Sequence, residues 1–201
     1  MAIINLQVSA STDDAHEVGG SVPVLDGISL PVGVDAAGNG VAAGYRFINV
    51  MIPRGSPIES AILTLRASAT GGLALTRVDG HLHDNSPTFT TTDGDVDGRG
   101  HTLANRSWDP SEWIAGTSYA SPDIKAVIQD IISRPGWVSG NALTILHIDD
   151  DGPINTRIFV ESYDSVPANA AKLDIIFTTP VQQPAAFGPN IIRGQRRVVS
   201  L

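Results

Sequence analysis

The stretch "SAILTLRAS", residues 60–68, carries the clearest pattern in the chain and decides its fold class. Small and apolar residues recur at every second position, and polar residues fill the positions between them, with Ile62 as the one exception. Side chains alternate between the two faces of a β-strand, so this period of two predicts a strand with one buried and one wetter face. The face predicted to be buried carries Ala61, Leu63, Leu65 and Ala67, and the other carries Ser60, Thr64, Arg66 and Ser68.

Short segments rich in β-branched and aromatic residues recur along the chain, separated by glycines and prolines. They predict further strands over residues 4–11, 45–52, 76–83, 142–148, 156–163 and 171–177. Residues 37–44, "AGNGVAAG", predict a flexible turn. Helical patterns do not alternate with these segments, which argues against a parallel α/β fold. We therefore predict an all-β protein, an antiparallel, jelly-roll-like β-sandwich with one amphipathic helix and an extended C-terminal arm.

The amphipathic helix is predicted to follow Ser121, which is suited to cap its N-terminus. Pro122 and Asp123 suit the first turn. Apolar residues then recur with helical spacing and form one stripe, which we expect to lie on the end or rim of a sheet. This stripe consists of Ile124, Val127, Ile128, Ile131 and Ile132.

The character of the sequence changes after residue 179, which divides the chain into a β-sandwich domain, residues 1–179, and an arm, residues 180–201. The arm lacks alternation, contains several prolines, and combines a basic cluster with an apolar tip. We expect such a tip to bury itself on a partner, and the alternative is a frayed tail. The residues predicted to bind the partner are Ile191, Ile192, Arg193, Arg196, Arg197, Val198, Val199 and Leu201.

The charge balance argues against a nucleic-acid partner. Acidic residues outnumber basic ones 21 to 13, whereas binding to phosphates needs a basic face. The chain has no cysteine, which excludes disulfides, thiolate metal sites and a cysteine nucleophile. Its first residues lack the features of a secretory signal, and no apolar run approaches the ~20 residues that span a membrane. We therefore predict neither a nucleic-acid nor a membrane partner.

The stretch "TTDGDVDGRG", residues 91–100, matches the first half of a calcium-binding loop at Asp93, Asp95 and Asp97. An EF-hand loop would need a glutamate at its twelfth position, where this chain has Ala104. Two interpretations stay open. One is a looser Ca²⁺ loop that stiffens a long excursion from the sandwich, and the other is a solvated acidic turn. No other cofactor is predicted.

Two further groups have both a chemical and a structural interpretation. Asp79, His81 and His83 would share one face of a strand, where they would either bind Zn²⁺ or form ordinary polar surface. Trp108 and Trp113 lie in a loop-like segment, where they would either stack on a sugar ring or pack over the edge of the sandwich. Sequence templates for known hydrolases, metalloproteases and nucleotide-binding enzymes are absent, so we predict a protein that is not an enzyme.

Four stretches resemble one kind of module. They are "AGYRFINVMIPRGSPIESAILTLRA" (43–67), "SPDIKAVIQDIISRPGWVSGNAL" (121–143), "FVESYDSVPANAAKLDIIF" (159–177) and, more weakly, "DNSPTFTTTDGDVDGRGHTLANRSW" (84–108). Over roughly residues 40–178 the chain resembles the DNRLRE-type β-sandwich, a module similar to carbohydrate-binding jelly rolls. This resemblance implies two antiparallel sheets and carries over no catalytic residue.

The chain departs from that family because it begins with Met, lacks an export signal and adds the C-terminal arm. These departures resemble a small phage virion protein, and they imply a structural role at the capsid surface. We expect a capsid decoration (cement) protein that binds the major capsid protein or other virion subunits and forms homo-oligomers such as trimers. The alternative is an extracellular carbohydrate-binding module or a tail adhesion protein that binds surface glycans.

Overall fold

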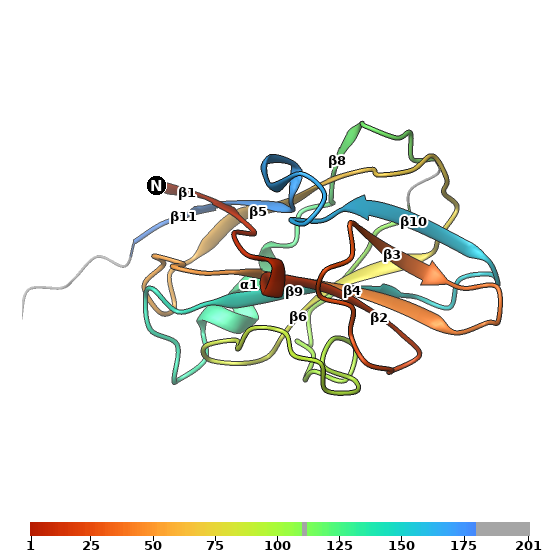
Figure 1. The fold of residues 1–201 in the computed structure, drawn as a ribbon. Coiled ribbons are helices and arrows are strands. Elements are labelled where there is room, and N and C mark those ends of the chain that lie inside the picture. The colour runs from red at the N-terminus through yellow and green to blue at the C-terminus, as the bar shows by residue number, and fades with distance from the viewer. Residues whose placement is uncertain (110–111, 180–201) are drawn as a thin grey trace, which may run out of the picture.

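The computed structural model describes residues 1–109 and 112–179, which form two antiparallel sheets packed face to face (Figure 1). The four-stranded sheet has the order β1 (Ala2–Gln7), β11 (Lys172–Phe177), β5 (Ile58–Arg66) and β8 (Ser118–Ala120). The seven-stranded sheet has the order β10 (Thr156–Glu161), β3 (Ser29–Val34), β4 (Gly40–Phe47), β9 (Leu143–Asp149), β6 (Thr76–Gly80) and β7 (Arg106–Ser107), with β2 (Asp14–Val18) also paired to β4. The predicted all-β sandwich is therefore confirmed.

The strand that decided the fold class behaves as its alternation predicts. In β5, Ala61, Leu63 and Leu65 are fully buried, while the intervening residues are exposed or half-buried. The buried residues face the inner side of the seven-stranded sheet, so both sheets contribute to one apolar core. Trp137 belongs to this core, and its indole N–H donates to the carbonyl of Ile52 at 2.9 Å.

Two sequence predictions about local structure were wrong. Residues 37–44 are not only a turn, because β4 begins at Gly40 and buries Val41 and Ala43. The strands β2 and β3 were not predicted, since "DAHEV" is largely polar and "SLPVGV" contains Pro31 and Gly33. Pairing with neighbouring strands, which a local pattern does not record, makes these segments strands.

The helix α1 (Lys125–Ile132) lies at the rim of the sandwich, as predicted. A Cβ on Gly80 of β6 would stand 2.7 Å from Ile131 Cδ1, so the missing side chain lets the helix approach the sheet. The predicted cap was wrong. Ser121 Oγ accepts the N–H of Leu63 at 3.0 Å, because the chain first runs along β5 and turns into the helix only after Ile124.

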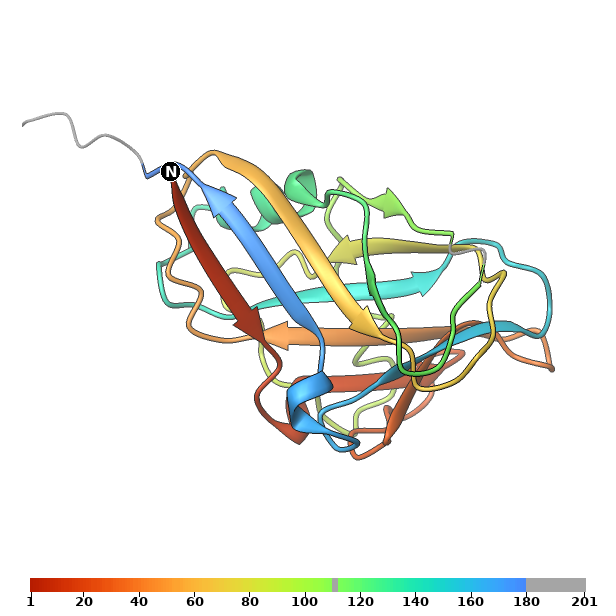
Figure 2. The same cartoon turned by 90° about the horizontal axis from the view of Figure 1, so that it is seen from above.

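The two sheets differ in what lies on their outer faces. A long connection, residues 81–105, crosses the outer face of the seven-stranded sheet and appears below it in Figure 1. Beneath it lies a second, smaller apolar cluster formed by Ala15, Ala42, Phe89, Val96, Leu146 and Ile148. In Figure 2, β1, β11 and β5 of the four-stranded sheet lie in front of the other elements, and no described segment covers them.

Candidate functional site

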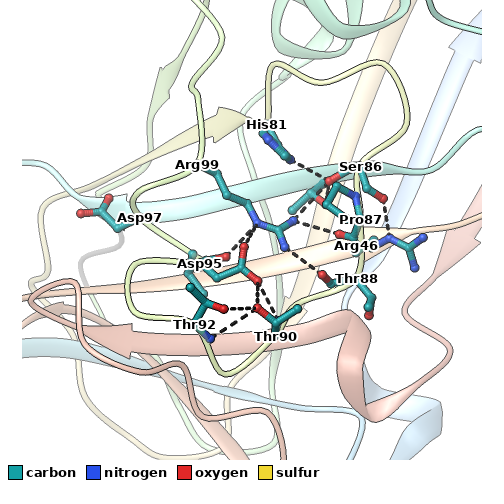
Figure 3. Close-up of polar contacts among 12 residues, drawn as sticks. Arg46, His81, Ser86, Pro87, Thr88, Thr90, Thr92, Asp95, Asp97 and Arg99 are labelled. Atoms are coloured by element: carbon teal, nitrogen blue, oxygen red, sulfur yellow. Dashed lines mark hydrogen bonds and ion pairs between the residues drawn. The ribbon is translucent and has the colours of Figure 1, made fainter.

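The connection over the seven-stranded sheet is organised by the buried Arg99, whose side chain is only 4% exposed (Figure 3). Its guanidinium donates to the Asp95 carboxylate at 3.1 Å and to the Asp95 carbonyl at 2.7 Å. It also donates to the carbonyls of Pro87 and Thr88, each at 3.1 Å. The same group lies 4.1 Å from the centre of the Phe89 ring, so one cation holds the loop together from inside.

This arrangement bears directly on the acidic run predicted as a possible calcium loop. Of the three carboxylates, Asp95 accepts hydrogen bonds from Arg99 and from the Thr90 N–H at 2.7 Å. Asp93 and Asp97 are exposed, and Figure 3 shows Asp97 turned away from this group. An arginine thus takes the role that the calcium interpretation gave to a metal ion. The geometry favours the acidic-turn interpretation for Asp93, Asp95 and Asp97.

A second buried charge anchors the loop to the sheet. Glu17 of β2 is 1% exposed, and its two oxygens accept the N–H groups of Val96 at 2.8 Å and Asp97 at 2.9 Å. Burial raises the pKa of Glu17, while these two hydrogen bonds oppose the rise. The acidic turn is thereby attached to β2 through its backbone, and the side chains of Asp93 and Asp97 take no part in that attachment.

The predicted zinc group does not assemble. β6 ends at Gly80, so Asp79, His81 and His83 do not continue along one strand. Asp79 instead accepts from His101 Nδ1 at 2.6 Å, and His101 Nε2 donates to the Asp97 carbonyl at 2.9 Å. Within residues 1–109 and 112–179, no group of three or more His, Cys, Asp or Glu side chains is placed to hold a metal ion.

His101 connects the loop to β6 through hydrogen bonds from both of its ring nitrogens. A carboxylate and a carbonyl both accept hydrogen bonds, so both ring nitrogens of His101 donate when the imidazole is protonated. The hydrogen bond to Asp79 raises the pKa of His101, which favours this form. Asp79 is 2% exposed and also pairs with Arg77 at 3.3 Å.

A serine and a histidine approach one another in the same region, at the spacing of a nucleophile and its base. Ser86 Oγ lies 2.8 Å from His81 Nδ1. Ser86 is, however, only 1% exposed, and its hydroxyl also contacts Thr144 Oγ1 at 2.7 Å. Burial lowers the pKa of His81 to about 4, with the charge of Arg99 acting in the same direction. This pair belongs to the hydrogen-bonded interior of the loop.

The tryptophans predicted as one alternative to stack on sugars are buried. Trp113 is fully enclosed and stacks on Tyr119 with ring centres 4.6 Å apart, and Trp108 is 7% exposed and stacks on His147 at 5.2 Å. Neither indole presents an open face to solvent. The structure therefore corrects the stacking interpretation of Trp108 and Trp113 in favour of packing at the edge of the sandwich.

The outer face of the four-stranded sheet is uncovered among the described residues (Figure 2). Ile3 on β1 is 66% exposed and lies opposite Ile176 on β11. Asn5, beside it, donates to Asp174 at 2.6 Å on the same face. Within the described part of the chain β1 pairs only with β11, so its other edge carries backbone groups without a sheet partner.

The corner of this face joins the two ends of the domain. Ala2 lies opposite Phe177 in the β1–β11 pair, so the N-terminal strand begins beside the C-terminal end of β11. The predicted arm residues, Ile191, Ile192, Arg193, Arg196, Arg197, Val198, Val199 and Leu201, lie outside the described residues. No helix within residues 1–109 and 112–179 has the length and apolar character needed to cross a membrane.

Comparison with models of known protein families and with curated proteins gave no match to this chain. Sequence reasoning also missed Arg99, Glu17 and His101, which organise the described loop. The i, i+4 spacing of Asp95 and Arg99 was the one local signal that could have suggested their ion pair. The contacts of Glu17 join residues about eighty positions apart, so no local pattern announces them.

Proposed function

We propose that this chain is a structural, non-catalytic protein of a phage virion surface, a capsid decoration protein that stabilises the head by binding neighbouring subunits. The observation that carries this proposal is the bare outer face of the four-stranded sheet, with its open edge at β1. An exposed edge strand is a template for pairing with another chain, and proteins that remain monomeric usually protect it.

The surface at this edge has the composition of a contact site. Ile3 and Met1 are 66% and 92% exposed, and they lie at the corner where β1 begins. Backbone groups along β1 can add to a strand of a neighbour, while exposed apolar side chains fill pockets on it. The partners would be the major capsid protein, other virion subunits or further copies of this chain, in trimers for example.

The arm gives this surface a second point of attachment. β11 ends at the same corner, and the sequence of residues 180–201 combines arginines with an apolar end. Arg193, Arg196 and Arg197 would pair with acidic groups on a neighbour, and Val198, Val199 and Leu201 would fill a groove. Two weak contacts made by one molecule across a lattice add to a tight one, because the second contact forms within a molecule already bound.

The experiment compares particles made with the full chain and with a chain ending at Thr179. We expect the shortened protein to fold with an unchanged unfolding temperature, to within about 2 °C, and to be lost from purified particles. Ile3→Lys on the bare face should also reduce incorporation. Leu103→Lys, at a 94% exposed apolar residue on the covered side, is the matched control. Incorporation that survives both truncation and Ile3→Lys would refute the proposal, and specific binding on a glycan array would replace it with glycan adhesion.

A further inference from the structure

The two strand orders end at four edge strands, and three of these edges are protected against pairing with another chain. β7 and β8 are only two and three residues long. β10 has a second neighbour besides β3, because Val160 is bridged to Ala67. β2, which branches from β4, is likewise bridged to Val24 through His16. Short edge strands and covered edges are ordinary devices against pairing between molecules, and β1 is the edge that departs from them.

Within residues 1–109 and 112–179, β1 has none of these protections on its outer edge. Its six residues, AIINLQ, include no charge, proline or glycine. The strand is also held in place, since Asn5 donates to Asp174 of β11 at 2.6 Å. Its far end is fixed to the short helix η2 (Pro167–Asn169), because the Gln7 amide donates to the Pro167 carbonyl at 3.0 Å. β1 is therefore an ordered, uncharged edge of the kind that pairs with another strand.

The register between β1 and β11 shows which backbone groups of β1 point to the open edge. The Val8 N–H donates to the Ala171 carbonyl at 3.0 Å, and these two residues continue the β1–β11 register, so they form a hydrogen-bonded pair. In an antiparallel ladder, hydrogen-bonded and non-hydrogen-bonded pairs alternate along the strand. The even-numbered residues of β1 therefore bond to β11, and the N–H and C=O groups of Ile3, Asn5 and Gln7 point away from it.

Two copies of β1 complement one another when they run antiparallel about a twofold axis at Asn5. Ile3 of each copy then lies opposite Gln7 of the other, and the two Asn5 residues lie opposite each other, so all the outward-pointing backbone groups of β1 find partners. This register also keeps the inward side chains of both strands on one face. Ile4 and Leu6, which are half-buried and pack on the core, would meet Leu6 and Ile4 of the second copy. Because β1 is uncharged, the pairing brings no like charges together along the strand.

We propose that β1 pairs with β1 of a second copy of this chain, with the twofold axis at Asn5, and that two four-stranded sheets thereby become one continuous sheet. The inference rests on the open edge that carries the proposed function, and it names the partner at that edge. A closed twofold contact of this kind uses the same surface on both copies and leaves no β1 edge open. The bare outer faces of the two copies lie side by side in the dimer, so one dimer presents two contact surfaces to a lattice.

The first test measures mass in solution by sedimentation. We expect the full chain to sediment at twice its mass of 21.1 kDa, and the chain ending at Thr179 also to be a dimer, because β1 lies outside the removed segment. Asn5→Pro removes an N–H that points to the open edge and is not used in the pair with β11. It should leave the domain folded and raise the dissociation constant of the dimer at least about tenfold. Asn5→Ala is the matched control, since it removes the side chain but keeps the N–H, and it should leave the constant nearly unchanged.

The second test reports the register and does not depend on the proline variant. The chain has no cysteine, so one introduced thiol shows how closely the two copies approach. Opposite residues of a hydrogen-bonded antiparallel pair have Cα atoms about 5.5 Å apart, a distance that a disulfide spans. Asn5→Cys should therefore give a disulfide-linked dimer on mild oxidation. Ser118→Cys, at an exposed position on β8 at the opposite edge of the sheet, is the control and should not.

The proposal is overturned if the full chain is a monomer, if a folded Asn5→Pro dimerises as tightly as the original protein, or if Ser118→Cys links as readily as Asn5→Cys. A full chain that is monomeric beside a dimeric chain ending at Thr179 would also overturn it, since residues 180–201 would then occupy the edge. Incorporation into particles separates this inference from the proposed function. A dimer that is absent from particles contradicts only the proposed function, and a monomer that is incorporated contradicts only the pairing through β1.

Discussion

The two outer faces of this sandwich differ, because a segment of the chain covers one of them and leaves the other exposed. The face of the seven-stranded sheet is covered by residues 81–105, which contribute Phe89, Val96 and the buried charge of Arg99 and are attached to β2 through Glu17. The face of the four-stranded sheet has no such cover among the described residues and ends in the open edge of β1. The difference teaches that Asp95 serves the structure of the long connection through its pairing with Arg99, whereas the uncovered outer surface lies on the other side of the sandwich.

The largest effect on stability is expected from disrupting residues 81–105, called the cover below, at Arg99. Arg99→Ala leaves the Asp95 carboxylate and the carbonyls of Pro87 and Thr88 without their donor and opens space over Phe89. Loss of one partner from a buried ion pair destabilises by about 3–5 kcal/mol, which urea unfolding should show as a lower midpoint. Arg106→Ala, at an exposed arginine, is the control and should change stability by less than about 0.5 kcal/mol. A loss below about 1 kcal/mol in Arg99→Ala would contradict this role.

A smaller effect is expected from the contact between cover and sheet at Gly44. A Cβ there would stand 2.3 Å from Phe89 Cζ, so Gly44→Ala must displace the ring. Such overpacking costs about 1–3 kcal/mol. Gly100→Ala, where nothing lies within 4 Å of the added carbon, should be nearly neutral. If the clash is the cause, adding Phe89→Leu to Gly44→Ala should cost less than the sum of the two single changes, which a double-mutant cycle measures.

The cover should also respond to pH through His101. Its pKa is raised in the folded protein, so the protonated ring contributes stability in full below about pH 6.5, the unfolded value. That contribution is lost as pH rises through the folded pKa. Unfolding followed across this range should show a stability difference between the original protein and His101→Gln that shrinks at higher pH. A constant difference would show that His101 does not titrate in its contact with Asp79.

The smallest effect on stability is expected on the bare face. Ile3→Lys changes an exposed residue at the edge, so the free energy of unfolding should move by less than about 0.5 kcal/mol. The same change should nevertheless weaken any association of the protein, including self-association measured by light scattering. If association is unchanged in this variant, the bare face is not the contact surface. The difference between the two outer faces would then have no consequence for binding.

Some strands and the helix could be predicted, because their apolar residues recur with a regular local period. The alternation over residues 60–68 and the helical stripe from Ile124 to Ile132 record which side chains face the core, and both were confirmed. The strands β2 and β3 could not be predicted, because their polar residues and Pro31 obscure the period that their pairing imposes. The acidic run was recognised, yet its partner Arg99 was not, since the spacing of residues does not reveal which side chain turns inward.

The sequence by itself determined the class of fold, because apolar residues at every second position make one face of a sheet apolar, and a chain with a single predicted helix buries that face against a second sheet. Only the tertiary structure decided which face would be covered, where Arg99 and Glu17 would be buried, and that Asp14 would lie opposite Tyr45. Those outcomes depend on contacts between residues far apart in the chain, such as Asp14 with Tyr163. Hydrogen bonds and ion pairs of this kind have no period along the sequence, so they appear only once the chain is folded.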